Sequence, residues 1–129
     1  MTRLIPAAAY MRGVGDAQVA EQRTRTEEWA RANGYEIVRE YVDVGSSERA
    51  QFIRMLQDAE NQPKPFEAVV VAHPDRLARS TDDALLYRSL LRRRLGIEVL
   101  FAGGPKPTGS DALAEKVAEE FFTLAKERR

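Results

Sequence analysis

Four arginines have the residue type and the placement to hold an anion. Each lies at or shortly after the end of a strand-like apolar segment: Arg12, Arg49, Arg76 and Arg79. A guanidinium group presents a planar fork of N–H donors that matches two oxygens of a phosphate at once. Arginines from three separate loops could therefore converge on one phosphodiester. The alternative is a solvated surface on which Arg76 and Arg79 pair with Asp75, Asp82 or Asp83.

The composition removes most other routes to catalysis. The chain of 129 residues has no cysteine and one histidine. Disulfides, thiolate metal sites and a cysteine nucleophile are therefore excluded, and one histidine cannot form a histidine cluster. We expect no metal and no cofactor. His73 precedes Pro74 and has no orienting partner visible in the sequence, so we expect a surface or packing role rather than a general base.

Charge is balanced over the whole chain but not along it. The chain has 20 Lys and Arg against 20 Asp and Glu, whereas residues 73–94 hold six Arg against three Asp. The longest apolar run, residues 68–72, has the length of a strand and is far shorter than the roughly 20 residues that span a membrane. We expect a single cytoplasmic domain, with no signal peptide and no membrane contact.

Apolar segments alternate with helical periods, and together they predict the elements that position the arginines. Strands are expected at residues 7–11, 36–43, 68–72 and 97–101. Helices are expected at residues 19–33, 52–59, 86–95 and 110–129. Gly34 and Gly96 are of the type that ends a helix in the left-handed conformation. Ser46, Ser47 and Ser80 are of the type that begins one.

This order predicts a three-layer α/β domain with an open, mostly parallel sheet between helices. Ligand sites in such sheets lie at the carboxyl ends of the strands, where the arginines follow. We expect residues 1–109 to form this core and residues 110–129 to form a long amphipathic helix. The apolar stripe of that helix suits contact with a second copy of the chain; it consists of Ala114, Val117, Phe121 and Leu124.

Several short motifs occur in order around the expected strand ends. The most specific is Asp75-Arg76-Leu77-Ala78-Arg79-Ser80, directly after the strand at residues 68–72. The earlier pieces are Tyr10-Met11-Arg12, Asp16-Ala17-Gln18, Gln22-Arg23, Gly34-Tyr35-Glu36, Asp43-Val44-Gly45 and Arg49. Over nearly its whole length, the chain resembles the N-terminal catalytic domain of serine recombinases of the resolvase/invertase type.

The resemblance implies a site-specific DNA recombinase. In that family a serine attacks a phosphodiester, which gives a 5′-phosphoserine link and a free 3′-hydroxyl, and strands are exchanged within a tetramer without a metal. Carried over to this chain, Arg12, Arg49, Arg76 and Arg79 would bind the scissile phosphate, Asp75 would orient them or move a proton, and Gln18 would support the site.

The resemblance also implies partners. DNA would be one, and a second copy of the chain would be the other, in a dimer or tetramer formed through residues 110–129. In the family, a helix of this kind leads on to a DNA-reading module. No helix-turn-helix or zinc-ribbon segment follows Arg129, so we expect an excised catalytic domain.

One position departs from the family pattern in a way that bears on activity. The family has Tyr-x-Arg-Val-Ser-Thr, whereas this chain reads Tyr10-Met11-Arg12-Gly13-Val14-Gly15, with Val14 at the position of the nucleophile. Valine has no oxygen with which to attack phosphorus. We expect a domain that is inactive by the family's route or diverged; the alternative is a non-catalytic dimerisation or regulatory module associated with DNA. Hydroxyls of Ser46, Ser47 or Ser80 are weaker substitutes because helix capping would occupy them.

Other interpretations match the sequence less well. Gly13-Val14-Gly15 resembles part of a dinucleotide-binding loop, with Asp43 on a ribose, but Gln18 stands where a third glycine is needed. A phospho-accepting receiver needs several carboxylates around Mg²⁺, and Asp43 is isolated. The run Arg92-Arg93-Arg94 suits the C-terminus of a helix, with a DNA backbone as the alternative contact.

Overall fold

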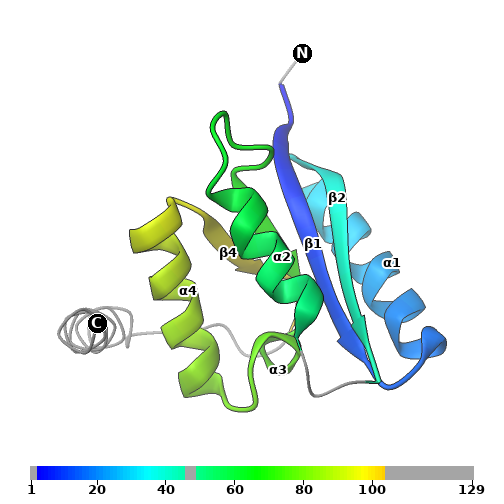
Figure 1. Cartoon of the computed structure of the whole chain (residues 1–129). Helices are drawn as coiled ribbons and strands as arrows, with labels where there is room; N and C mark the ends of the chain where they lie inside the picture. Colours follow the sequence, from blue (N-terminus) through cyan, green and yellow to red (C-terminus); the bar gives the residue numbers. More distant parts are fainter. Residues whose placement is uncertain (1–2, 46–48, 104–129) are drawn as a thin grey trace, which may run out of the picture.

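Four parallel strands form one sheet in the order β2-β1-β3-β4 (Figure 1). The computed structural model describes residues 3–45 and 49–103. Its strands are β1 (Ile5–Gly13), β2 (Tyr35–Val44), β3 (Ala68–Val71) and β4 (Glu98–Phe101). Its helices are α1 (Asp16–Ala32), α2 (Ala50–Ala59), α3 (Pro74–Leu77) and α4 (Thr81–Leu95).

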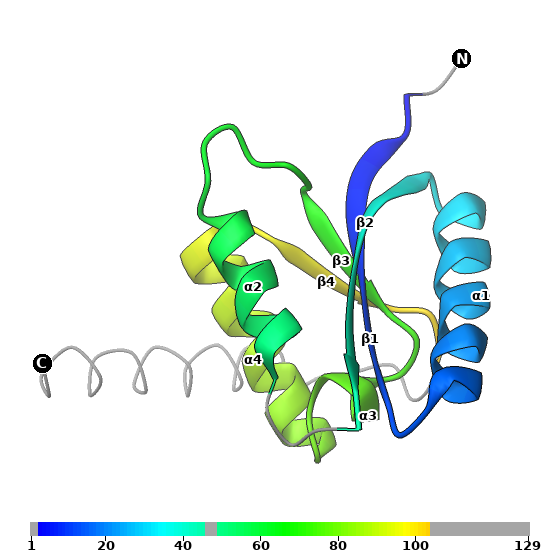
Figure 2. The ribbon, with the colours of Figure 1, turned by 45° about the vertical axis from the view of Figure 1, so that its right-hand side comes forward.

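The helices form a layer on each face of the sheet. Helix α1 covers one face, α2 and α4 cover the other, and α3 lies at the end of the sheet (Figure 2). Successive side chains of a strand point to opposite faces. Accordingly, Ala8 and Tyr10 of β1 pack in a cluster with Phe52 of α2, whereas Met11 packs with Val19 of α1. Even-numbered positions of β1 therefore face α2 and α4.

The predicted α/β fold is confirmed for the described residues. All four predicted strands are present, β1 and β2 being longer than expected, and the sheet is parallel throughout. The three predicted helices that fall in this part are also present. The predicted helix at 110–129 lies outside the described residues. Within the described ranges, no helix is long and apolar enough to cross a membrane.

The predicted helix boundaries have mixed outcomes. Gly34 has φ +86° and Gly96 has φ +65°, so both take the left-handed conformation expected after a helix. Ser80 Oγ accepts a hydrogen bond from Asp83 N at 3.1 Å and caps α4, as predicted. The predicted start of the second helix at Ser46-Ser47 is wrong, because α2 begins at Ala50. Helix α3 was not predicted, since its four residues are too few to give a helical period.

Candidate functional site

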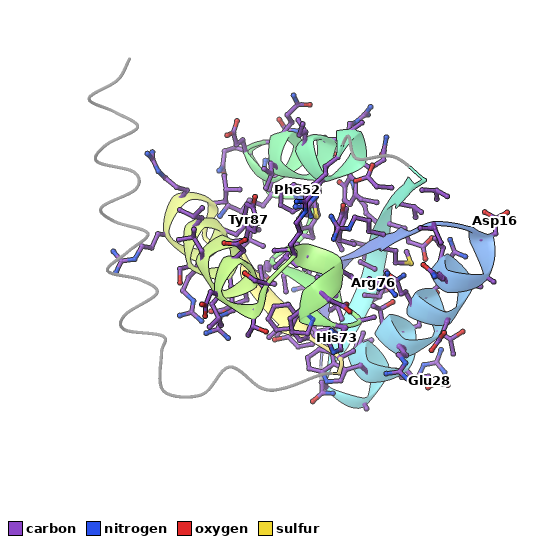
Figure 3. The ribbon with its side chains drawn as sticks, turned by 90° about the horizontal axis from the view of Figure 1, so that it is seen from below. Asp16, Glu28, Phe52, His73, Arg76 and Tyr87 are labelled. Carbon is purple, nitrogen blue, oxygen red and sulfur yellow. The ribbon has the colours of Figure 1, made fainter. Side chains whose placement is uncertain are left out.

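Two of the predicted arginines, Arg12 and Arg76, lie close together at the carboxyl ends of β1 and β3. Figure 3 views the molecule from this end of the sheet and labels Arg76. Arg12 Nη2 donates to the carbonyl oxygen of Asp75 at 3.1 Å, and Arg76 Nη1 donates to the carbonyl oxygen of Arg12 at 3.4 Å. The carboxylate of Asp75 is a more distant partner of Arg76, 3.6 Å from Nε. Both guanidinium groups are thus held mainly by backbone oxygens.

The end of β1 is fixed from the α1 side by the side chain of Gln22. Gln22 Oε1 accepts from Arg12 N at 3.0 Å, and Gln22 Nε2 donates to Arg12 O at 2.8 Å. Pro6 O accepts from Glu67 N, just before β3, so even-numbered β1 residues direct their backbone groups towards β3. The pairing with β3 ends at Tyr10 and Val71. The Gln22 amide therefore continues the hydrogen bonding of the sheet where β3 has ended.

Gln18 holds the next turn of the chain in a similar way. Its Oε1 accepts from Val14 N at 3.1 Å, and its backbone oxygen accepts from Gln22 Nε2 at 3.2 Å. A Cβ atom on Gly13 would lie 3.0 Å from both Cβ and Oε1 of Gln18, so the close approach depends on glycine. We call Gln18 and Gln22 the amide clamp. Directly beyond it, the side chain of Val14 is 80% exposed.

The start of α2 is held by a buried carboxylate from β2. Asp43 Oδ1 accepts from Gln51 N at 2.9 Å, and Oδ2 accepts from Phe52 N at 3.1 Å and from the Tyr10 hydroxyl at 2.8 Å. The first N–H groups of a helix have no partner within the helix. Asp43 supplies their acceptor from the neighbouring strand, which is why α2 needs no serine cap.

Arg49, at the N-cap of α2, lies among aromatic rings. Its guanidinium carbon is 4.1 Å from the ring centre of Phe52, 5.4 Å from that of Tyr10 and 5.7 Å from that of Tyr87. Arg49 Nε donates to the Tyr10 hydroxyl at 3.4 Å. We call Tyr10, Phe52 and Tyr87 the aromatic cage. Arg49 is thus attached to the same face of β1 that carries Arg12, two residues after Tyr10.

Tyr10 connects the aromatic cage to Asp43. Burial raises the pKa of the Tyr10 hydroxyl to about 12; the hydrogen bond from Arg49 lowers it, and the hydrogen bond to Asp43 raises it. The hydroxyl therefore keeps its proton through the neutral range and donates it to Asp43. Its lone pairs remain available to Arg49.

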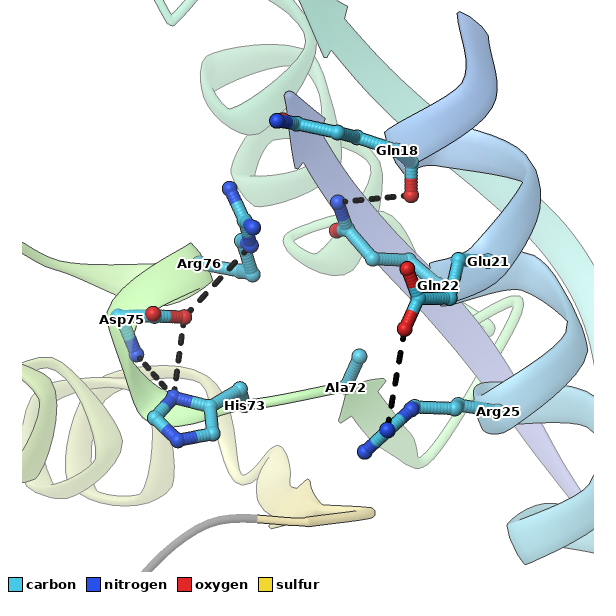
Figure 4. Close-up of a pocket in the computed structure, with 8 residues that line it drawn as sticks. All are labelled: Gln18, Glu21, Gln22, Arg25, Ala72, His73, Asp75 and Arg76. Atoms are coloured by element: carbon cyan, nitrogen blue, oxygen red, sulfur yellow. Dashed lines mark hydrogen bonds and ion pairs between the residues drawn. The ribbon is translucent and has the colours of Figure 1, made fainter. Parts of the chain in front are cut away.

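Beside α3 there is a polar pocket of about 180 Å³ (Figure 4). It is lined by Gln18, Glu21, Gln22, Arg25, Ala72, His73, Asp75 and Arg76. His73 Nδ1 accepts from Asp75 N at 3.2 Å, which caps α3, and lies 3.0 Å from Asp75 Oδ1. The backbone N–H of Asp75 thus orients the ring of His73, which was not visible in the sequence. Because its Nδ1 accepts the backbone hydrogen bond, the contact supports a capping role.

Two further predicted arginines, Arg79 and Arg92, have other surroundings. Arg79 follows α3, is exposed and makes no hydrogen bond or ion pair to another described residue. Arg92, in the last turn of α4, pairs with Glu98 at 3.2 Å. Ser46 and Ser47 lie outside the described residues. In the described ranges, no group of three acidic, histidine or cysteine residues could hold a metal ion.

Sequence reasoning overlooked several residues that organise the site. Gln22 was used only as part of a family motif, although a buried glutamine on the same helix face as Val19 and Thr26 is a signal of a specific polar contact. Asp43 was assigned to a family motif and considered as a ribose or metal ligand, but not as a helix cap. Phe52 and Tyr87 carry no signal of their own, because they meet Arg49 only through the tertiary fold.

Known proteins similar to the chain share its sheet and helices. The N-terminal catalytic domain of TP901-1 integrase has 25% sequence identity and a TM-score of 0.67, covering 96% of this chain and 98% of that one. A resolvase family site-specific recombinase from Streptococcus pneumoniae has 25% identity and a TM-score of 0.68, covering 96% and 89%.

A third structure shows likeness in fold alone. The C-terminal catalytic domain of ISC1926 TnpA, an IS607-like serine recombinase, has 23% identity and a TM-score of 0.63, covering 93% of this chain and 80% of that one. No curated protein matches the chain. The family model described as "Resolvase, N terminal domain" matches residues 7–127, nearly the whole sequence. The chain therefore belongs to the resolvase family of serine recombinases, as an N-terminal catalytic domain.

Proposed function

We propose that this domain binds a DNA phosphodiester at its four arginines and does not cleave it by the serine route. The observation that carries the proposal is the pairing of Arg12 with Arg76 at the carboxyl ends of β1 and β3. Each guanidinium is held through a backbone carbonyl oxygen, at 3.1 Å and 3.4 Å, rather than by a closely bound carboxylate. Arginine charge that is not neutralised at short range is available to phosphate oxygens.

The membership in the serine recombinase family supports DNA as the source of the phosphodiester. Arg49 directly precedes α2 and Arg79 lies in the turn between α3 and α4, and we assign both to the same phosphate. The backbone oxygen of Asp75 accepts from Arg12 and its carboxylate lies 3.6 Å from Arg76 Nε, so we assign Asp75 to orient the arginines. Gln18 supports the turn after β1 through Val14 N.

The missing step is nucleophilic attack. In the family's mechanism the serine oxygen attacks phosphorus and a DNA oxygen leaves, which keeps the energy of the bond in a covalent link. Val14 lies at that position and is 80% exposed, so the place is open to solvent and to substrate but carries no hydroxyl. Ser80 is engaged as the cap of α4 and is a poor substitute.

A reactive phosphodiester tests the missing step without a known DNA site. The probe is bis(p-nitrophenyl) phosphate, and the readout is the intact mass of the protein. In Val14→Ser the new hydroxyl attacks phosphorus, p-nitrophenolate leaves and the hydroxyl proton passes to solvent, so the protein gains one nitrophenyl phosphoryl group. We expect no gain in wild type, in Val14→Ala or in Val14→Ser combined with Arg12→Ala.

Two results would contradict the proposal. An adduct on the wild-type chain would mean that another residue attacks, and peptide mass mapping would identify it, with Ser46 and Ser47 as the first positions to inspect. The second result concerns binding alone. If inorganic phosphate causes no saturable change in the arginine side-chain NMR signals of the wild type, the arginines do not form a phosphate site.

Val14 also favours a second candidate function, a non-catalytic module that assembles with copies of itself near DNA. Such a module would use residues 110–129 as its contact, which we propose from their apolar stripe. Sedimentation equilibrium of the full chain would report a dimer or tetramer. Val117→Asp and Phe121→Asp would reduce it to a monomer, while Thr123→Asp, off the stripe, would not. A wild-type monomer at all concentrations would contradict self-association.

A further inference from the structure

Arg49 is held differently from the other arginines of the site. Its guanidinium carbon lies 4.1 Å from the ring centre of Phe52, with Tyr10 and Tyr87 as the other two walls of the aromatic cage. The three rings come from β1, α2 and α4. A cation is attracted to the face of an aromatic ring within about 6 Å of its centre, and more strongly where water is excluded.

The rings of the cage also hold one another. Phe52 meets Tyr10 edge to face, with ring centres 5.2 Å apart and planes at 65°. It meets Tyr87 in the same manner, at 5.8 Å and 74°. Edge-to-face pairs in this range are favourable. The cage is therefore a built feature of the core rather than a chance contact of one side chain.

Within the cage, Arg49 has donors without acceptors. Its hydrogen bond to the Tyr10 hydroxyl is long, at 3.4 Å, and its Nη2 is buried with no hydrogen-bond partner among the described residues. The acidic group nearest through hydrogen bonds is Asp43, which reaches Arg49 only by way of Tyr10. A buried donor without a partner costs free energy until an acceptor binds it.

We propose that Tyr87 is a positioning residue that presents Arg49 to a phosphate oxygen. The ring of Tyr87, with that of Phe52, fixes the guanidinium by its charge while using none of its N–H donors. A carboxylate in the same place would fix the group equally well but would occupy its donors and neutralise it. The inference rests on the proposed phosphate-binding function and extends it to α4, to which no part of the site had been assigned.

The opposite arrangement would be a cage that stores Arg49 away from the phosphate. The two arrangements predict opposite effects of opening the cage on phosphate binding. If the cage presents Arg49, opening it weakens phosphate binding, because the guanidinium loses its fixed position. If the cage stores Arg49, opening it strengthens phosphate binding, because the guanidinium is released.

The test is an NMR titration of the full chain with inorganic phosphate, following the Nε–Hε signals of the arginines. We expect Tyr87→Leu to weaken binding by about threefold to tenfold, the loss of one partly desolvated cation–π contact. Tyr87→Phe keeps the ring and should bind as the wild type does. The matched control is Tyr35→Leu, which removes a tyrosine stacked on Trp29 at 5.9 Å, on the α1 face, and should leave binding unchanged.

A second measurement reads the cage without phosphate. The ring currents of the cage should move the Cδ protons of Arg49 upfield in the wild type and in Tyr87→Phe, and less so in Tyr87→Leu. If the Cδ protons of Arg49 show no upfield shift in the wild type, the proposal is overturned, and this holds even if Tyr87→Leu fails to fold.

The outcomes separate this proposal from the function on which it rests. Equal or tighter phosphate binding by a folded Tyr87→Leu overturns the positioning role and leaves the phosphate site standing. Absence of saturable binding in the wild type overturns both. Weaker binding in Tyr87→Leu and in Tyr35→Leu alike would assign the effect to general loosening of the core, which also overturns the role of Tyr87.

Discussion

Arg12 and Arg49 lie on the same face of β1 and are fixed by opposite means. The backbone of Arg12 is held by the amide clamp: Gln22 accepts a hydrogen bond from its N–H at 3.0 Å and donates one to its carbonyl oxygen at 2.8 Å. The guanidinium of Arg49 is held by the aromatic cage, with one long hydrogen bond at 3.4 Å and a buried Nη2 that has no partner among the described residues.

The difference concerns which part of each arginine is left available. An amide that satisfies the strand backbone fixes where the side chain begins and leaves the guanidinium to find ligands. Aromatic rings fix where the guanidinium itself lies without occupying its N–H donors. Around Arg12, hydrogen bonds of the amide clamp fix the positions of the groups. Around Arg49, the packing of the aromatic cage and the carboxylate of Asp43 fix them. The two sides should therefore respond differently to substitution.

The largest effect is expected on the cage side, from Asp43→Ala. Asp43 is 7% exposed and accepts three hydrogen bonds, two from the first turn of α2 and one from Tyr10. Its removal leaves buried donors without acceptors, and we expect a loss of about 3 kcal/mol in the free energy of unfolding. Urea denaturation followed by circular dichroism measures it.

Asp58→Ala is the matched control for this substitution. Asp58 also accepts a tyrosine hydroxyl, that of Tyr41 at 2.7 Å, and pairs with Arg39 at 3.3 Å, but it caps no helix. Because it is more exposed, we expect a loss of only about 1 kcal/mol. Equal losses from the two substitutions would mean that Asp43 does not hold the start of α2.

The next effect is a dependence on alkaline pH carried by Tyr10. Its pKa is raised to about 12 in the folded chain, chiefly by burial, against 10.0 for an ordinary tyrosine. A raised folded pKa contributes stability that is complete below pH 10 and is lost as the pH rises through 12. We expect the stability of the wild type relative to Tyr10→Phe to fall by about 2 kcal/mol between pH 9 and pH 12.

Urea denaturation of both proteins at the two pH values measures this dependence. Tyr41, whose pKa is also raised by burial, is present in both proteins, so its contribution cancels in the difference. A difference that stays constant with pH would mean that the Tyr10 hydroxyl ionises in the folded chain as easily as in the unfolded one.

On the clamp side, Gln22→Met tests the backbone contact alone. Methionine has nearly the shape of glutamine but cannot bond the N–H and carbonyl of Arg12. We expect a loss of between about 1 and 2 kcal/mol in stability. Hydrogen exchange at the Arg12 amide should quicken at the same time, whereas Gln18→Met, which frees only the Val14 amide, should leave it slow. Slow exchange at Arg12 in Gln22→Met would contradict the clamp.

Much of the fold could be predicted because its signals are local. The run Val69–Val71 is apolar on both faces, as a central parallel strand must be, and Gly96 provides the left-handed residue that ends α4. The start of α2 could not be read in the same way. The first N–H groups of α2 are capped by Asp43, which belongs to the preceding strand and not to the residues next to the helix. The serines nearby in the sequence therefore led to a wrong boundary.

In the candidate site, too, one part could be predicted from the sequence and another part depends on the tertiary fold. The residue types and order of Arg12, Arg76 and Asp75 predict that these residues meet, and they do so at the carboxyl ends of adjacent strands. The aromatic cage is formed by three elements whose sequences each have an ordinary core residue at the relevant place. Phe52 and Tyr87 are typical of an amphipathic helix, and only the fold turns their rings towards one guanidinium.

The smallest effect is expected at Gly13, where this chain departs from the family pattern beside Val14. An added methyl group would lie 3.0 Å from Cβ and Oε1 of Gln18, so in Gly13→Ala that side chain must shift by a few tenths of an ångström, which strains its hydrogen bond from Val14 N. We expect a cost of about 1 kcal/mol. A Gln18→Ala background removes Oε1 but keeps Cβ, so the same substitution should cost about half as much there.

A double-mutant cycle measured by urea denaturation gives this coupling directly. Additive losses would mean that Gly13 and Gln18 are independent. A strong coupling would mean that the glycine and the clamp form one unit at the turn after β1. The change of the family's Val-Ser-Thr to Gly13-Val14-Gly15 would then be a rebuilt turn, since restoring only the serine at position 14 would leave the glycine-dependent packing of Gln18 in place.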